Sequence, residues 1–273
     1  MRDFHDKVAF VTGAASGLGF ALARAFGRAR MKVMLADIDV DGLENAVDEL
    51  KKDQISARGV ECDVSDRVSV QHAAAETLAA FGKVHVVCNN AGPTSGGPLE
   101  LITPGDCDWI IGVDVMGTIY GCQTFLPHIR AHGEGGHIVS TASVLGMIPA
   151  PGIAIHNAAK AAIISLSQTL AAELAGTSIG VSVLVPGFMR TRIADREHID
   201  RNRPKRFGER TPHSPQGEEQ LAALVRAGMD PNEVAEKVMH GIKENQLYIF
   251  SHPEWRSTLE AHFQQILAAY PNT

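Results

Sequence analysis

The chain has 273 residues, of which 45% are hydrophobic, and it carries a formal net charge of −6 at pH 7. This length and composition are typical of a soluble globular protein with one large domain or two small ones. The acidic balance argues against a nucleic-acid partner, because nucleic-acid binders carry a surplus of basic residues.

No segment of the chain predicts secretion or membrane insertion. The opening sequence MRDFHDKVAF contains no apolar signal core. The long run over residues 138–172, charged only at Lys160, is interrupted by Gly146, Pro149 and Pro151, which argues against a spanning helix. The four cysteines occur without CxxC or metal-ligand spacing. We therefore expect reduced thiols, no metal site and a cytoplasmic location.

The first predicted elements are a strand over residues 7–12 and a helix over residues 20–29, joined by a glycine-rich turn. This order presents the amide groups of a helix N-terminus to a phosphate. The glycine spacing is G-x-x-x-G-x-G rather than G-x-G-x-x-G, so the glycines alone could reflect only a tight turn. Because a strand precedes the turn and a helix follows it, we interpret the turn as a pyrophosphate cradle.

The second predicted strand, residues 32–37, ends at Asp37. An acidic residue about 20 positions after such a turn can hydrogen-bond a ribose diol and repel a 2′-phosphate. Residues 13–19 contain no Lys or Arg that could neutralise such a phosphate. Both observations favour NAD over NADP as the cofactor. Asp37 could instead cap the next helix, although Asp39 or Asp41 fits that role better.

Predicted strands and helices alternate along the rest of the chain. Right-handed crossovers between such strands predict an α/β fold with a doubly wound parallel sheet and helices on both faces, in a single domain over residues 1–273. The further predicted helices are 40–53, 66–81, 106–131, 155–175, 231–244 and 253–269, and the further strands are 57–62, 84–88, 136–142, 179–185 and 246–250.

Ligands of such sheets bind at the carboxyl ends of the strands, where several polar or turn-forming residues are predicted to meet. These residues are Gly13, Asp37, Asp63, Asn90, Ser143 and Pro186. Residues 192–230 change to a charged composition with prolines, glycines and no clear period. We interpret that segment as a substrate lid or loop, or else as a solvated excursion.

Ser143, His156 and Lys160 form a candidate acid/base set. A lysine in a run that otherwise predicts burial needs a reason, because burying an unpaired ammonium group costs several kcal/mol. Since His156 precedes Lys160 by four residues, the two side chains share one face of a helix.

Several motifs, in this order and spacing, resemble the short-chain dehydrogenase/reductase family over nearly the whole chain. They are T-G-A-A-S-G-L-G at 12–19, D-V at 63–64, N-N-A-G at 89–92, Ser143, and P-G-F-M-R-T at 186–191. The resemblance implies a single Rossmann-type domain with a seven-stranded parallel sheet. It also implies an NAD(P)-dependent oxidoreductase of alcohols and ketones that forms a homodimer or homotetramer.

The resemblance further implies roles for single residues. Lys160 would bind the nicotinamide ribose, and Ser143 would hydrogen-bond the substrate oxygen. The other implied cofactor ligands are Gly13, Ser16, Gly17, Leu18 and Gly19 for the pyrophosphate, Asp37, Asp63 and Val64 for the adenosine, Asn90, Ala91 and Gly92 for the floor beneath the cofactor, and Pro186, Gly187, Met189 and Thr191 for the nicotinamide.

Two positions depart from the family pattern. The family has a tyrosine as proton donor and acceptor where this chain has His156, and an asparagine where this chain has Asp114. Free histidine has a pKa of about 6.5, against about 10 for tyrosine, and a nearby ammonium lowers the histidine pKa further. Neutral imidazole could accept a proton from an alcohol. An ionised Asp114 close to Lys160 would partly cancel the lysine charge and restore a usable pKa.

We therefore expect an NAD-dependent oxidoreductase of a secondary alcohol or ketone, hydrophobic or aromatic, with Ser143, His156, Lys160 and Asp114 as catalytic residues. One alternative is an NAD-binding protein with little or no redox activity, whether His156 is natural or introduced. Another is non-redox proton transfer with His156 as the base.

Residues 94–98, 145–155 and 192–230 are expected to line the substrate pocket, and their few fixed charges favour an apolar small molecule. Apolar helix faces over residues 106–131 and 155–175 suggest contacts in a homo-oligomer, although a buried core would show the same pattern.

Overall fold

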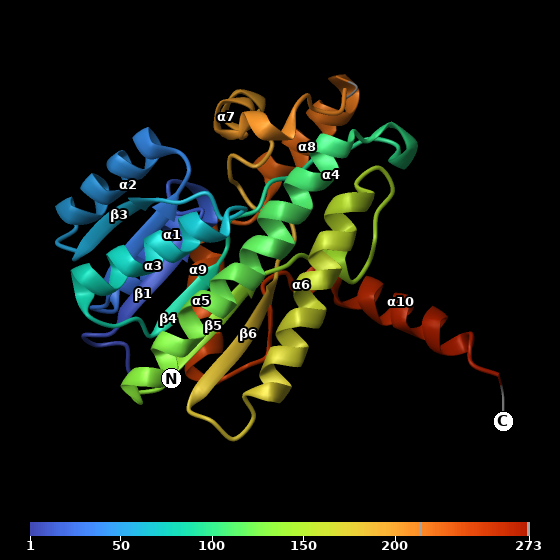
Figure 1. Ribbon diagram of the computed structural model, residues 1–273. Coiled ribbons are helices and arrows are strands. Elements are labelled where there is room, and N and C mark those ends of the chain that lie inside the picture. Colours follow the sequence, from blue (N-terminus) through green and yellow to red (C-terminus); the bar gives the residue numbers. More distant parts are fainter. Residues whose placement is uncertain (213–214, 272–273) are drawn as a thin grey trace.

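The computed structural model of the chain describes residues 1–212 and 215–271. Within these residues it contains one seven-stranded parallel sheet in the order β3-β2-β1-β4-β5-β6-β7 (Figure 1). The expected doubly wound fold is therefore confirmed. The strands are β1 (Val8–Thr12), β2 (Lys32–Asp37), β3 (Ala57–Glu61), β4 (Val86–Asn89), β5 (Gly136–Thr141), β6 (Ile179–Val185) and β7 (Tyr248–Phe250).

Helices cover both faces of the sheet, so its strands are buried on both sides. Alternate residues of β1 show why: Val11 packs toward one helical layer and Phe10 toward the other. One layer contains α1 (Gly17–Arg28), α2 (Val40–Lys52) and α9 (Pro231–Lys243), and the other contains α3 (Arg67–Phe81), α5 (Gly117–His132) and α6 (Ala154–Glu173).

The helix expected over residues 106–131 is interrupted. It consists of α4 (Pro104–Ile110), a π-helical turn η2 (Ile111–Met116) and α5. A π-helical turn widens the helix locally and is often found at functional sites. Hydrophobic periodicity did not predict this turn, because the apolar residues continue through it.

Residues 192–230, interpreted from the sequence as a substrate lid or loop or as a solvated excursion, form short helices. They contain α7 (Arg196–Asn202), a short 3₁₀ turn η4 (Lys205–Phe207) and α8 (Pro215–Ala227), while residues 213 and 214 lie outside the described part of the chain. The Asp195 side chain caps α7 by accepting a hydrogen bond from the His198 N–H at 3.1 Å. Short polar helices of this kind carry a weak periodic signal.

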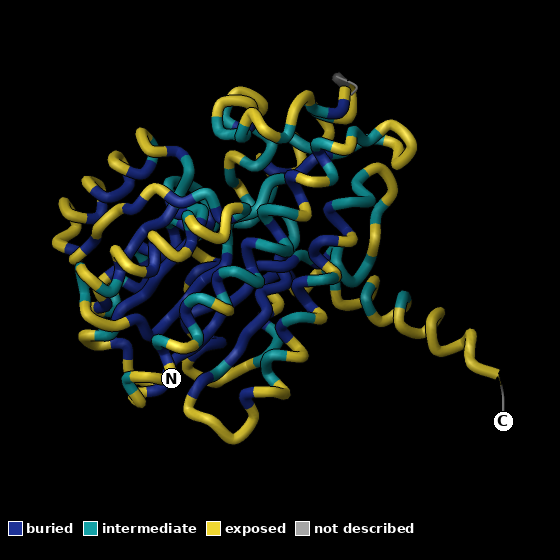
Figure 2. The backbone as a smooth tube through the Cα atoms, in the orientation of Figure 1, coloured by how far each residue is buried: buried dark blue, intermediate teal, exposed yellow. Residues whose placement is uncertain are grey.

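The C-terminal segment extends away from the body of the molecule. After the 3₁₀ turn η5 (Pro253–Trp255), helix α10 (Arg256–Ala268) projects outward and is largely exposed (Figures 1 and 2). The remaining 3₁₀ turns are η1 (Leu99–Leu101) and η3 (Val144–Gly146). Among the described helices, none has the length and apolar character needed to cross a membrane.

The layer formed by α3, α5 and α6 depends on a buried aromatic pair. Phe10 on β1 and Phe125 on α5 have no exposed surface, and their ring centroids lie 4.3 Å apart. Contacts between such rings add to the hydrophobic stabilisation that burial provides.

Phe125→Ala is therefore expected to lower the free energy of unfolding by about 3–5 kcal/mol, since it removes buried apolar surface and leaves a cavity. Chemical denaturation followed by circular dichroism measures the change. Val68→Ala, at a position of α3 that is 69% exposed, is the control and should change stability by less than about 0.5 kcal/mol. A loss for Phe125→Ala no larger than that of the control would contradict this packing.

Candidate active site

A single cavity of about 1960 Å³ lies at the carboxyl ends of the strands. It gathers residues that are far apart in the sequence, and Asp114 is the one sequence-predicted site residue that does not line it. The sequence-predicted residues that line it are Gly13, Ser16, Gly17, Leu18, Gly19, Asp37, Asp63, Val64, Asn90, Ala91, Gly92, Ser143, His156, Lys160, Pro186, Gly187, Met189 and Thr191.

The N-terminus of α1 forms one end of this cavity. Its N-cap residue, Ser16, makes no side-chain capping hydrogen bond, and the first turn contains no acidic residue. The first amide groups of a helix have no partner within the helix and favour an anion. The residues present here therefore fit a pyrophosphate group.

Asp37 is held rigidly at the end of β2. One of its carboxylate oxygens accepts a hydrogen bond from the Ala15 N–H at 2.8 Å, and the other accepts one from the Asp39 N–H at 3.0 Å. The cap of α2 is Asp39, which accepts a hydrogen bond from the Gly42 N–H at 3.2 Å. The capping role expected for Asp39 is confirmed, and Asp37 keeps a fixed position beside the cavity.

Asp63 binds the segment over residues 192–230. One of its carboxylate oxygens accepts hydrogen bonds from Ser65, and the other lies 2.6 Å from the Arg206 guanidinium group. Arg201 of the same segment pairs with Asp39 at 3.1 Å. Both ion pairs hold the segment against the end of the cavity where the adenosine is expected, a contact that the sequence pattern did not predict.

Asn90 has a structural role in the floor of the cavity. Its side-chain amide donates to the Thr12 carbonyl at 3.0 Å, and its side-chain oxygen accepts from the Thr141 hydroxyl at 3.1 Å. The side chain of Asn90, which directly follows β4, thus connects the ends of β1 and β5. These bonds fix the spacing of three strand ends beneath the expected cofactor position.

Lys160 on α6 forms a buried ion pair with Asp114 of the π-helical turn η2. Their side chains are 6% and 0% exposed, and Lys160 Nζ lies 3.3 Å from Asp114 Oδ2. Lys160 Nζ also donates a hydrogen bond to the Thr141 carbonyl at 3.2 Å. Gly92 packs against the pair: a Cβ atom there would lie 2.6 Å from Asp114 Oδ1 and 2.9 Å from Lys160 Nζ.

The ion pair does not remove the cost of burying the carboxylate. Burial raises the pKa of Asp114 to about 6, although the Lys160 ammonium acts in the opposite direction. Neither carboxylate oxygen of Asp114 has a hydrogen bond within the described residues apart from its contact with that ammonium. Asp114 is therefore a carboxyl group that can change its charge near neutral pH.

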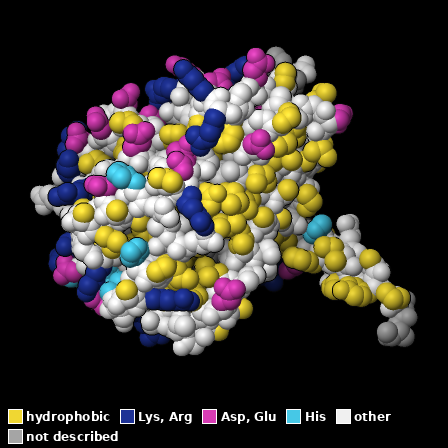
Figure 3. Space-filling view, viewed as in Figure 1, with side chains coloured by type: hydrophobic (Ala, Val, Ile, Leu, Met, Phe, Trp, Pro, Cys, Tyr) yellow, Lys and Arg dark blue, Asp and Glu magenta, His cyan; other side chains and the backbone are white. Residues whose placement is uncertain are grey.

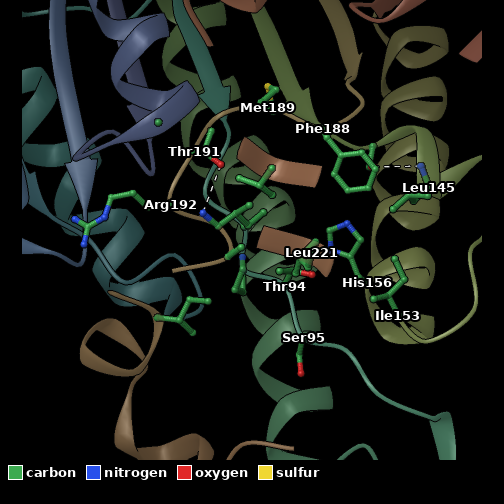
Figure 4. A pocket seen from close by; sticks show the side chains of 18 of the residues that line it. Thr94, Ser95, Leu145, Ile153, His156, Phe188, Met189, Thr191, Arg192 and Leu221 are labelled. Carbon is green, nitrogen blue, oxygen red and sulfur yellow. Dashed lines mark hydrogen bonds between the residues drawn. The ribbon is translucent and has the colours of Figure 1, made fainter. Parts of the chain in front are cut away.

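His156 lies one helical turn before Lys160, and its imidazole points into the cavity near Phe188 and Ile153 (Figure 4). Burial lowers the pKa of His156 to about 3; Lys160 lowers the pKa further, and the Pro93 carbonyl group opposes both effects. The sequence-based reasoning named the lysine as the cause, whereas burial is the larger one. The expectation that a nearby Asp114 would restore a usable histidine pKa was wrong for the same reason.

Ser143 is half-buried at the end of β5. Its hydroxyl oxygen accepts a hydrogen bond from the Leu145 N–H at 3.1 Å, so the hydroxyl proton can be donated to another group. Ser143, neutral His156 and Lys160 all line the cavity, as the sequence predicted.

His85, His132 and Glu134 lie close enough to suggest a metal site away from the cavity. Their nitrogen atoms are already engaged, however. His85 Nδ1 accepts from the Val8 N–H at 3.1 Å, so its proton is on Nε2, which faces Glu134. His132 Nδ1 accepts from the Glu134 N–H, and its Nε2 donates to a backbone carbonyl. The cluster fits a hydrogen-bond network better than a metal centre.

Known proteins resemble this chain in both fold and sequence. The family profile described as short chain dehydrogenase matches residues 7–202. The chain is 40% identical over 271 residues to a Cα-dehydrogenase of Sphingobium sp., covering 98% of this chain and 87% of that relative. It is 30% identical over 262 residues to a 1-deoxy-11-beta-hydroxypentalenate dehydrogenase of Streptomyces avermitilis, covering 95% and 90%.

A solved structure of a short-chain dehydrogenase/reductase from Burkholderia phymatum in complex with NAD matches with a TM-score of 0.94 and 38% identity. The match covers 100% of this chain and 98% of that chain. The chain belongs to the short-chain dehydrogenase/reductase family, and the dehydrogenase names of its relatives support an oxidoreductase activity.

The pKa of His156 leads to a prediction about stability. Between about pH 3 and the pKa of about 6.5 of an unfolded histidine, the folded protein binds fewer protons at this side chain than the unfolded chain does. Stability from this group is therefore lost as the pH falls below about 6.5. His156→Phe removes this titration. As the pH falls below about 6.5, the free energy of unfolding of the variant should therefore rise relative to that of the wild type by up to about 1.4 kcal/mol per pH unit.

Urea denaturation of both proteins from pH 7.5 to pH 4.5 measures this difference, provided that both unfold in a two-state transition. A difference that stays constant over this range would show that His156 is not held neutral by burial.

Proposed function

We propose that the protein is an NAD-dependent dehydrogenase that oxidises a bulky, uncharged secondary alcohol to a ketone. The observation that carries the proposal is the convergence, in one cavity, of an anion-binding helix N-terminus, a fixed acidic residue for the ribose, and a serine beside a neutral imidazole. The dehydrogenase names of the relatives and the NAD complex of the Burkholderia phymatum protein support it.

The preference for NAD is supported by charge at the adenosine end. Asp37 lies where a 2′-phosphate would come close, and residues 13–19 contain no cation. Two arginines near this end, Arg201 and Arg206, are already paired with Asp39 and Asp63. A 2′-phosphate would therefore meet carboxylates and engaged guanidinium groups.

The lining of the reacting end supports an apolar substrate. Leu145, Ile153, Phe188, Leu221 and His156 come from distant segments and surround the same space (Figure 4). Among the described residues, the Lys and Arg side chains that line the cavity each form an ion pair with an acidic residue: they are Lys160, Arg190, Arg192, Arg196 and Arg210. Among the described residues, no unpaired Arg or Lys of the lining is left to select an anionic substrate.

In the proposed oxidation, Ser143 and His156 have separate roles. Bound NAD would supply the hydride acceptor. The Ser143 hydroxyl donates a hydrogen bond to the substrate oxygen, and neutral His156 accepts the hydroxyl proton of the alcohol. Reduction of a ketone would need a protonated imidazole, which a pKa of about 3 makes scarce at neutral pH. The site therefore favours oxidation.

The same low pKa supports a second candidate function. An imidazole with a pKa of about 3 is a weak base, which would suit a protein that binds NAD with little redox activity.

The two functions differ in a direct assay. Calorimetric titration with NAD is followed by a screen of 1-arylalkanols for NADH absorbance between pH 6 and pH 10. We expect turnover by the wild type and a loss of about 10²–10⁴-fold in kcat for His156→Ala. NAD binding without turnover, together with activity in His156→Tyr, would favour the second function. Failure to bind NAD would refute both.

The charge of Asp114 should appear in the pH dependence of oxidation. Below pH 6 the Asp114 carboxylate becomes protonated and no longer compensates the Lys160 ammonium, which then opposes positive charge on His156. We expect kcat/KM to fall as the pH decreases through about 6. Asp114→Asn should be slow at every pH and should lose this step. A variant that keeps the step would assign the ionisation to another group.

Asp37→Asn tests the cofactor preference. The amide keeps one hydrogen-bond acceptor for the neighbouring backbone but removes the negative charge. We expect the ratio of kcat/KM for NADP to that for NAD to rise about 100-fold, equivalent to about 2.7 kcal/mol of relieved repulsion. Asp41→Asn, on the exposed surface of α2, is the matched control and should leave the ratio unchanged. Equal ratios for the two variants would exclude Asp37 as the selective residue.

A homo-oligomer remains part of the proposal. Hydrophobic side chains gather on the visible face over α4 and α5 and along α10 (Figure 3). On α10, Phe263, Ile266 and Leu267 are 46%, 48% and 57% exposed. Exposed apolar surface of this extent supports association with other copies of the chain.

A further inference from the structure

Two peptide groups in the turn after β6, Pro186–Gly187 and Phe188–Met189, are bonded to one buried ring, that of His252. The Gly187 N–H donates to His252 Nδ1 at 3.0 Å, and His252 Nε2 lies 2.9 Å from the Phe188 carbonyl oxygen. Because Nδ1 accepts a backbone N–H, the ring proton is on Nε2, which donates to that carbonyl. One neutral imidazole thereby fixes the orientation of both peptide groups.

The fit between this ring and the turn leaves no spare room. A Cβ atom at Gly187 would lie 2.8 Å from Trp255 Nε1 and 2.9 Å from His252 Cδ2. His252 itself is only 7% exposed. The absence of a side chain at Gly187 therefore allows the imidazole to reach the backbone directly.

Residues next to His252, at the end of β7, also fix its position. The fully buried hydroxyl of Ser251 lies 2.8 Å from His252 Nδ1, and Lys237 Nζ donates to the Ser251 carbonyl at 2.5 Å. Just before these residues, β7 pairs with β6 in a register that places Phe250 opposite Val185. The imidazole is thus attached to a fixed part of the sheet.

The turn that His252 holds borders the part of the cavity where the proposed function places the substrate and the nicotinamide. Its first residue, Pro186, accepts a hydrogen bond from the Val144 N–H at 2.9 Å, which connects it to the segment that carries Ser143. The ring of Phe188 points into the cavity where His156 also points (Figure 4). A rotation of either peptide group would move the wall of the site.

We propose that His252 is a positioning residue: it orients the Gly187 and Phe188 peptide groups so that residues 186–191 can hold the nicotinamide half of NAD. The proposal rests on the proposed function, since it assigns this end of the cavity to the nicotinamide. His252 acts through the turn rather than on the reacting atoms. Its loss should therefore weaken binding of the nicotinamide half and leave the adenosine half unaffected.

Three substitutions separate the two hydrogen bonds. His252→Asn places an amide oxygen near the position of Nδ1 and keeps the acceptor for Gly187. His252→Gln places an amide nitrogen near the position of Nε2 and keeps the donor for Phe188. His252→Phe keeps a planar ring and removes both bonds. His240→Phe, on the exposed side of α9, is the control for the loss of a histidine.

The first measurement is made without cofactor. Amide hydrogen exchange at Gly187 should be slow in the wild type and in His252→Asn, and faster in His252→Phe and His252→Gln, which lack the acceptor. Unchanged exchange in His252→Phe would overturn the claim that this ring holds the turn. This result does not depend on NAD binding or on activity.

The second measurement compares NADH with ADP-ribose, which lacks the nicotinamide, by fluorescence and competition titration. In His252→Phe we expect the Kd for NADH to rise about tenfold, the effect of one or two lost hydrogen bonds, while the Kd for ADP-ribose stays within about twofold. His252→Asn should recover part of the NADH affinity. Equal weakening of both ligands, or of neither, would overturn the positioning role. Failure of wild-type protein to bind NADH would refute the proposed function instead, and the exchange result would still decide whether His252 holds the turn.

Discussion

The site depends on the burial of one ammonium group. Lys160 stands in an apolar helix with 5% of its surface exposed, and an unpaired charge there would cost several kcal/mol. The Asp114 carboxylate at 3.3 Å compensates it, because the π-helical turn η2 brings that carboxylate to α6. Gly92 leaves space for the pair. Three separate segments, α6, η2 and the residues after β4, thus together allow the Lys160 ammonium to be buried.

The same pair limits what His156 can do. A partly compensated lysine leaves a smaller positive field at the imidazole than a free one would, but burial alone already holds the histidine pKa far below its ordinary value. The ring is therefore uncharged at neutral pH, with one nitrogen as a donor and the other as an acceptor. The proposed oxidation requires this uncharged form of the ring, and burial separately raises the pKa of Asp114 to about 6.

Segments distant in the sequence complete both ends of the cavity. At the end proposed to bind the adenosine, Arg206 contacts Asp63, 143 positions earlier in the chain. At the reacting end, His252 holds a turn 65 positions earlier in the chain through Gly187. The parallel sheet makes both contacts possible, since it brings the carboxyl ends of its strands to one edge and leaves the later segments to close over it.

The sequence by itself determined the alternation of strands and helices and the strand ends at which Gly13, Asp37 and Ser143 meet, because these follow from local periodicity and turn chemistry. The family followed from the resemblance of several motifs in their order along the chain. It also identified His156 and Asp114 as departures. Only the tertiary structure decided the pKa of His156, the distance between Asp114 and Lys160, and the contact of His252 with Gly187. Burial and long-range contacts arise from the packing of whole elements, and no short stretch of sequence encodes them.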